Sequence, residues 1–346
     1  MIRQLRFLPF AAAVAAALSV SSASAITIVE VFTEAEAAGG INNPFLDTVV
    51  VDGSTAYAVV RDLDGADDAG VVVAYDGTNF TTVSSVAQWQ ATGSTNDPAA
   101  GNGAAYVGGV VRFVSSLDNS VYEIDLGTGT ATEVVSAATI NAAIGSSASL
   151  VASFEVTSSG QIYAYDALSA NRQIVSISPA NAVSIEIPPA DFATSFGTTV
   201  GGVGVLGDTI LVGTNTFDAI VGWDTVNDVA STVVSTAQIL AVTGAASAGF
   251  GDIFAAPDGL VYFYESTADS LLVFDPADVG GTLSVLVSEA QFLAGPSSDT
   301  INQLAWYNGS IAFTDTSEGF YSVVPEPASA LAALLVVGGV SLRRRR

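Results

Sequence analysis

The chain of 346 residues contains no cysteine, no histidine and no lysine. Without cysteine it forms no disulfide, and without cysteine and histidine it lacks the usual nitrogen and sulfur ligands of a zinc site. The Ser-His-Asp triad and the Cys-His pair of nucleophilic catalysis are excluded for the same reason. Any acid–base catalysis by this chain would therefore depend on carboxylates.

Basic residues are few and stand mostly at the two ends. Between residues 26 and 324 they are Arg61, Arg112 and Arg172, against 33 of the 34 acidic residues, so this region has a formal charge of 3 − 33 = −30. Such a surface repels nucleic acid and anionic lipid, keeps the protein soluble and attracts cations. We therefore expect no nucleic-acid binding.

The first 25 residues have the layout of a secretory signal peptide. Arg3 and Arg6 precede an apolar segment over residues 7–20, and small residues run up to Ala25. This order predicts Sec export and removal of residues 1–25 by signal peptidase, with Ile26 as the first mature residue. About 300 mature residues can then bury a core large enough for stability without disulfides.

The last 22 residues combine three features. Pro325, Glu326 and Pro327 come first, an apolar run over residues 328–342 follows, and the chain ends on four arginines: Arg343, Arg344, Arg345 and Arg346. The prolines end any preceding strand, and the arginines resist membrane crossing and stay on the cytoplasmic side. A helix over the apolar run would measure roughly 22 Å against a hydrocarbon core of roughly 30 Å, so the pattern predicts a transient transmembrane anchor.

This tail resembles the sorting signal of the PEP-CTERM family, whose members are handled by the membrane protease and transpeptidase exosortase. The matching residues are Val324 to Pro327, Leu331, Gly338, Gly339 and the terminal arginines. The resemblance implies a Gram-negative source that produces exopolysaccharide, cleavage near Pro325 to Pro327, and an inner-membrane-anchored precursor that passes to the envelope or exterior. An ordinary tail anchor with a chance Pro-Glu-Pro is the alternative.

A segment of about 50 residues recurs between the two ends. One of its markers is an Ala-rich stretch that closes on a glycine, and these glycines are separated by 53, 52, 52, 47 and 51 residues: Gly40, Gly93, Gly145, Gly197, Gly244 and Gly295. A second marker is a turn pair between apolar runs, such as Asp52-Gly53 or Asp258-Gly259, which supplies the positive φ of a tight hairpin. A further strand follows each hairpin and ends on a turn-forming residue such as Asp76, Asp125 or Asp224.

Each repeat therefore contains about four short strands and a brief helical connection, which is typical of a propeller blade. Six repeats predict an all-β, six-bladed β-propeller over residues 26–324. A pair of β-sandwiches and a β-helix are the competing folds. The last repeat has only three strands before Pro325, and residues 26–31 supply an isolated strand. We expect this N-terminal strand to complete the last blade and remove its free edge.

One loop has the composition of a calcium site. Asp62, Asp64, Asp67 and Asp68 place four carboxylates in seven residues among glycines, and oxygen-rich loops of this kind can bind Ca²⁺. The spacing is not that of an EF-hand, because position 12 counted from Asp62 is Val73. A solvated acidic turn is the alternative.

No catalytic pair can be identified from the sequence. Asp62, Glu155, Asp252 and Glu265 are candidates for a glycosidase pair, which needs two carboxylates about 5 to 10 Å apart. The aromatic residues of the strands, such as Tyr163, are expected to pack between blades, although one at a strand end could stack on a sugar.

Three functions remain open. The first is a non-enzymatic exported propeller, sorted by exosortase and associated with exopolysaccharide. The second is a carboxylate-dependent polysaccharide hydrolase or lyase, and the third is a propeller that docks proteins. We expect paired carboxylates at the central mouth of an enzyme, exposed aromatic residues at that of a binding module, and a broad apolar rim on a docking ring.

Overall fold

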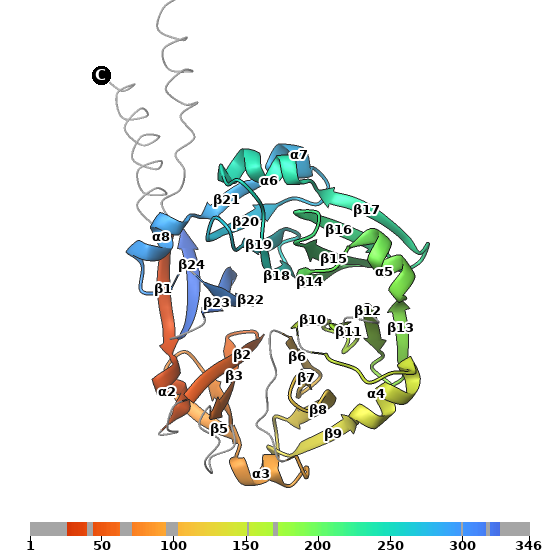
Figure 1. Ribbon diagram of the computed structural model, residues 1–346. Helices are drawn as coiled ribbons and strands as arrows, with labels where there is room; N and C mark the ends of the chain where they lie inside the picture. Colours follow the sequence, from red (N-terminus) through yellow and green to blue (C-terminus); the bar gives the residue numbers. More distant parts are fainter. Residues whose placement is uncertain are drawn as a thin grey trace, which may run out of the picture. The chain divides into compact units, whose positions relative to one another are not determined.

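Six four-stranded antiparallel sheets follow one another around a ring in the computed structural model (Figure 1). The structure describes residues 26–39, 44–62, 71–94, 103–150, 152–168, 172–298, 300–315 and 319–325. The predicted six-bladed propeller is confirmed. Each of the first five blades consists of four consecutive strands, because each hairpin turn returns the chain beside the strand it has just left.

The strand boundaries are as follows. Blade one holds β2 (Pro44–Asp52), β3 (Thr55–Asp62), β4 (Val71–Tyr75) and β5 (Phe80–Ser84); blade two holds β6 (Ala104–Val107), β7 (Val110–Ser115), β8 (Ser120–Asp125) and β9 (Ala131–Val135). Blade three holds β10 (Ala152–Val156), β11 (Ile162–Asp166), β12 (Gln173–Ile177) and β13 (Val183–Ile187); blade four holds β14 (Val200–Leu206), β15 (Thr209–Thr214), β16 (Ala219–Asp224) and β17 (Val229–Val234). Blade five holds β18 (Phe250–Ala255), β19 (Val261–Glu265), β20 (Ser270–Phe274) and β21 (Ser284–Val287); blade six holds β22 (Ile301–Tyr307), β23 (Ser310–Asp315), β24 (Gly319–Pro325) and β1 (Ile26–Thr33).

The first strands of the blades line the centre of the ring. Each of β2, β6, β10, β14 and β18 contacts the first strand of the next blade, and β22 contacts β2. Residues 28–323 thus form one closed, compact unit. Its hydrophobic core is divided into clusters that lie between neighbouring blades, as face-to-face packing of twisted sheets requires.

The N-terminal strand closes the ring as predicted. β1 is the outermost strand of blade six and pairs with β24, in the order β1-β24-β23-β22. The Phe32 side chain is 1% exposed, and its ring lies 5.4 Å from that of Phe320 in the same blade. It also lies 5.3 Å from Tyr75 and 5.4 Å from Phe80 of blade one, so the strand joins the first and last blades.

Short helices connect the blades, as the Ala-rich stretches predicted. They are α2 (Glu34–Ala38), α3 (Val86–Gln90), α4 (Ala137–Ile144), α5 (Pro189–Ser195), α6 (Thr236–Thr243) and α8 (Glu289–Ala294), while α7 (Val279–Thr282) precedes β21 within blade five. In four of them a Glu or Gln side chain of the first turn accepts the backbone N–H of the residue before the helix, at 2.9 to 3.0 Å. This capping fixes where each helix begins.

The six closing glycines do not all end their helices in the same way: α3 ends at Ala91 and α5 at Phe196, before Gly93 and Gly197. α2 ends at Gly39, which has a positive φ of 60°, one residue before Gly40. α8 ends at Gly295 with φ −90°, whereas Gly145 and Gly244 end their helices in the left-handed conformation. The repeated glycines therefore lie at or near the helix ends, but their backbone conformation differs from one helix to the next.

The described residues contain no helix long and apolar enough to cross a membrane. The signal peptide, Ala25, and the tail from Glu326 through Pro327 to the terminal arginines lie outside the described residues. Pro325 is the last residue of β24, so the last blade strand ends at the first of the two prolines.

Candidate functional site

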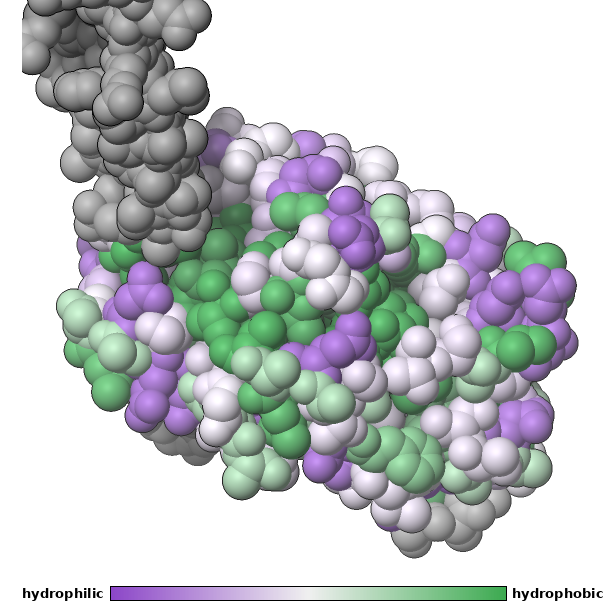
Figure 2. All heavy atoms as spheres, turned by 90° about the horizontal axis from the view of Figure 1, so that it is seen from above, coloured by the Kyte–Doolittle hydropathy of each residue, from purple (hydrophilic) through white to green (hydrophobic). Residues whose placement is uncertain are grey.

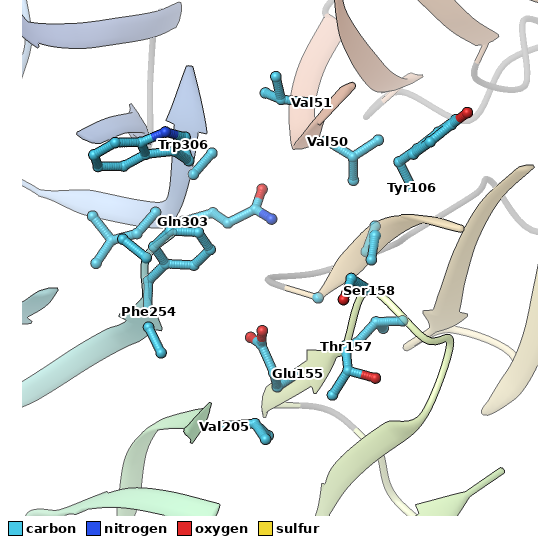
Figure 3. Close-up of a pocket in the computed structure, with 18 of the residues that line it drawn as sticks. Val50, Val51, Tyr106, Glu155, Thr157, Ser158, Val205, Phe254, Gln303 and Trp306 are labelled. Carbon is cyan, nitrogen blue, oxygen red and sulfur yellow. The ribbon is translucent and has the colours of Figure 1, made fainter. Parts of the chain in front are cut away.

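A cavity of about 690 Å³ lies at the centre of the ring. All six innermost strands, or the turns that follow them, contribute to its lining. Closure of the blades into a ring creates this cavity, because the first strands converge without filling the axis. Figure 3 shows the cavity with Glu155 and Gln303 pointing into the same space and the Phe254 ring beside them.

The walls of the cavity are largely apolar. Val50, Val51 and Val205 line it, and the half-buried Phe254 presents its ring to the interior (Figure 3). Tyr106 and Trp306 lie at the margin with their rings turned away from the axis (Figure 3). They pack against aromatic rings of neighbouring blades, at 6.4 Å and 6.3 Å between centroids.

Asp252, on β18, is one of two carboxylates in the lining. It is 7% exposed and accepts two backbone hydrogen bonds, from the N–H of Ile253 at 3.0 Å and from that of Leu304 at 2.7 Å. The second bond ties blade five to blade six. Burial nevertheless raises the pKa of Asp252 to about 7, against the lowering effect of the two N–H donors.

Glu155, at the end of β10, is the second carboxylate, and part of its surface faces the cavity. Within the described residues its carboxylate has no hydrogen-bond partner. Burial, and next the negative charge of Asp252, raise the pKa of Glu155 well above its usual range. No arginine is among the described residues that line the cavity, so the protein supplies no positive charge to either carboxylate there.

Gln303, on β22, is 6% exposed and has a fixed orientation. Its Oε1 accepts from Thr48 Oγ1 and, at 2.9 Å, from the backbone N–H of Val49, both on β2. These two donors require the carbonyl oxygen on their side, so the amide nitrogen points into the cavity (Figure 3). That nitrogen has no partner among the residues that the structure describes.

Of the four candidate carboxylates, the structure brings Glu155 and Asp252 together. Glu265 is fully buried and accepts the backbone N–H groups of Gly249, Thr267 and Ala268 at 2.7 to 3.1 Å, so it holds a loop in place. Asp62 ends β3, and its side chain is not described.

The predicted calcium loop falls outside the described residues, since Asp64, Asp67 and Asp68 lie within residues 63–70. Calcium binding there stays a prediction. Among the described residues, no three acidic side chains are gathered closely enough to hold a metal ion.

Packing between blades explains most of the aromatic residues of the strands, which the sequence predicted to lie there. Tyr165, Tyr262, Phe263 and Tyr264 are buried, and Tyr163 is half-buried. The sequence analysis missed Phe254 and Gln303. Both lie on the first strand of a blade, a position that the repeat alone could have marked as lining the axis.

Large exposed hydrophobic side chains are scattered over the described part of the chain. They occur on five different blades or the helices beside them, for example Leu117, Ile185, Phe217 and Leu293. Figure 2 shows one face of the molecule, on which hydrophobic residues gather in the middle of the view and hydrophilic residues lie mostly around them.

No family model matches the chain, and no curated protein matches it. Solved propeller structures do. A gluconolactonase from Xanthomonas campestris matches with a TM-score of 0.54 at 11% identity, over 86% of this chain and 89% of that one. A streptogramin B lyase matches at 0.51 with 10% identity, over 87% and 98%, and a virginiamycin B lyase from Staphylococcus aureus at 0.50 with 12%, over 87% and 89%. Such low identities establish a shared fold alone.

Proposed function

We propose that the protein is an exported, exosortase-sorted component of the cell envelope or extracellular matrix, whose propeller binds exopolysaccharide in its central cavity without cleaving it. The signal-peptide pattern and the tail that resembles a PEP-CTERM signal support the route. Signal peptidase, exosortase and, transiently, the inner membrane are its partners on that route. The cavity supports the binding role.

The observation that carries the binding role is the set of polar groups that share the cavity with Phe254. The Glu155 carboxylate offers hydrogen-bond acceptors and the Gln303 amide nitrogen offers a donor, both directed into the cavity (Figure 3). A sugar presents hydroxyl groups that donate and accept at once, and an apolar C–H face that packs on an aromatic ring. Donor, acceptor and ring together therefore suit a sugar unit.

Binding is tested by calorimetric titration of residues 26–324 with oligosaccharides from the exopolysaccharide of the native host. We expect Phe254→Ala to weaken binding at least tenfold, because it removes the ring beside the polar groups. Glu133→Gln is the matched control, since Glu133 lies on the exposed face of β9. Equal affinities for wild type and Phe254→Ala, with both proteins folded, would place any binding outside the cavity and refute the proposal.

The sorting route is tested by mass spectrometry of the mature C-terminus in the native host, with Arg343 to Arg346 intact or replaced by alanine. The proposal expects a terminus near Pro325 to Pro327 in the first case and unprocessed protein in the second. A tail retained through Arg346 in the wild type contradicts it.

A polysaccharide hydrolase or lyase is the second candidate, because Glu155 and Asp252 share one cavity and both have raised pKa values. A protonated and an ionised carboxyl group are the acid and base that such reactions require. Incubation of the same polysaccharide with the protein should then release reducing ends or unsaturated ends. Glu155→Gln and Asp252→Asn should each abolish that release, whereas intact polymer after prolonged incubation with wild type would exclude the candidate.

A further inference from the structure

The central cavity contains negative groups without any positive counterpart from the protein. The chain has no lysine and no histidine, and the three arginines between residues 26 and 324 have partners elsewhere. Arg61 pairs with Asp47 at 3.4 Å, Arg112 pairs with Glu123, and Arg172 interacts with Tyr165. The negative charge of Glu155 and Asp252 is therefore neutralised either by bound protons or by a positively charged ligand.

The surroundings of Glu155 favour an organic cation. The Phe254 ring and the Glu155 carboxylate are directed into the same cavity, and Val50, Val51 and Val205 also line it (Figure 3). An aromatic face attracts an ammonium group, and the attraction grows when water is excluded. A carboxylate in the same space adds a charge-assisted hydrogen bond.

A second, independent group points to an oxygen on the same ligand. The Gln303 side chain is 6% exposed, its carbonyl oxygen is committed to Thr48 and Val49, and its amide nitrogen is directed into the cavity without a partner among the described residues. Because this nitrogen opens into the cavity, it can donate a hydrogen bond to an acceptor on whatever fills the space. A ligand that carries both an amine and hydroxyl oxygens meets both requirements.

We infer that the cavity takes an amino sugar, with its protonated amine beside Glu155 and Asp252 and a hydroxyl oxygen at the Gln303 amide. The inference rests on the proposed carbohydrate-binding function and names the class of sugar. It agrees with the formal charge of −30 between residues 26 and 324, which disfavours an acidic polymer and attracts a cationic one.

Binding of this ligand has a second signature. Burial raises the pKa of both carboxyl groups, that of Asp252 to about 7, so the free pair binds protons more tightly than exposed carboxyl groups do. An ammonium group placed beside them stabilises their ionised forms, so binding should release protons. Tyr106 is the other titratable residue of the described lining, and its ring is turned away from the axis (Figure 3).

The test compares a glucosamine tetrasaccharide with its fully N-acetylated counterpart, titrated calorimetrically into residues 26–324 near neutral pH in two buffers of different ionisation enthalpy. We expect the amine form to bind at least tenfold more tightly and to release protons. Glu155→Gln should remove most of this preference and reduce the proton release, and it should weaken binding of the amine form much more than binding of the N-acetylated form. The exposed control Glu133→Gln should preserve the preference, which separates cavity recognition from general attraction to an acidic protein.

The possible results separate this inference from the proposed function. Equal affinity for both tetrasaccharides, or a preference that Glu155→Gln leaves intact, overturns the amino-sugar inference alone. The amino-sugar inference is also overturned if both tetrasaccharides bind only when Ca²⁺ is added, since the carboxylates would then bind a metal ion. Failure of both tetrasaccharides and of the host oligosaccharides to bind overturns the carbohydrate-binding function itself.

Discussion

At the scale of single residues, the turn chemistry could be predicted and the site could not. Asp125 and Asp224 end β8 and β16 as expected, and Asp76 comes directly after β4. Each of the three accepts backbone N–H groups two and three residues on. Those hydrogen bonds lower the pKa of Asp76 and Asp125; the pKa of Asp224 is lowered first by the side-chain amide of Asn227 and then by its backbone donors. Such bonds are local, so the sequence specifies them. Glu155 and Asp252 are 97 residues apart, and among 33 carboxylates no local pattern identifies them.

Glu155→Gln should stabilise the protein at alkaline pH. The folded protein raises the pKa of this carboxyl group above its unfolded value, so the folded state holds the proton more tightly and its stability falls as pH rises between the two pKa values. Replacing the group with a neutral amide removes this loss. We expect the free energy of unfolding to rise by about 1 to 3 kcal/mol at about pH 8 and to change little at about pH 4.

The measurement is urea denaturation of wild type and variant at both pH values. Glu133→Gln, which removes one charge from the exposed side of β9, serves as the control for general repulsion. A Glu155→Gln variant that is less stable than wild type at alkaline pH would show that the carboxylate has a stabilising partner.

At the scale of strands and blades, irregular pairing explains why the cavity lining was not predictable. The first strand of a blade shifts register against the second near Thr48 in β2, near Asp252 in β18 and near Gln303 in β22. A bulge inserts one residue and reverses which side chains face the axis. Alternation read from the sequence therefore assigns the residues on either side of a bulge to the wrong face.

Arg112 links two blades, so we expect its substitution to lower the stability of the ring. It is 2% exposed on β7, pairs with Glu123 of its own blade, and donates to the Ser178 carbonyl at 3.1 Å and to Asn181 Oδ1 at 2.8 Å in blade three. Arg112→Met leaves these acceptors without their donor. We expect it to lower the free energy of unfolding by about 3 kcal/mol, measured by urea denaturation.

Arg112→Lys should recover little of this loss, because one ammonium group cannot reach acceptors on both blades as the guanidinium does. An unchanged denaturation midpoint in Arg112→Met would mean that apolar packing alone holds blades two and three together.

At the scale of the whole molecule, both the blade number and the closure of the ring could be predicted. Six glycine-marked repeats correspond to six blades, and the strand missing from the last repeat is β1. Repetition makes the blade number predictable, because the sequence contains six copies of one supersecondary unit. Each copy buries its apolar faces only when it packs against neighbouring copies. The size of the cavity was not predictable, since it depends on how closely the innermost strands approach.

Deletion of residues 26–32 should destabilise the whole ring. It removes most of β1, exposes the edge of β24 and takes away Phe32, which packs against both blade one and blade six. We expect a lower and broader thermal transition and a tendency to aggregate through the free edge. Phe32→Ala should cost about 3 to 5 kcal/mol without exposing that edge. A deletion variant as stable and cooperative as wild type would show that β1 is dispensable.

A crystal structure of residues 26–324 with a bound oligosaccharide of the host exopolysaccharide tests the central claim most directly. The account predicts a sugar unit inside the ring, packed on Phe254 and hydrogen-bonded to Glu155 and to the Gln303 amide nitrogen. A sugar bound on the outer surface, or an empty cavity at saturating oligosaccharide, would contradict it.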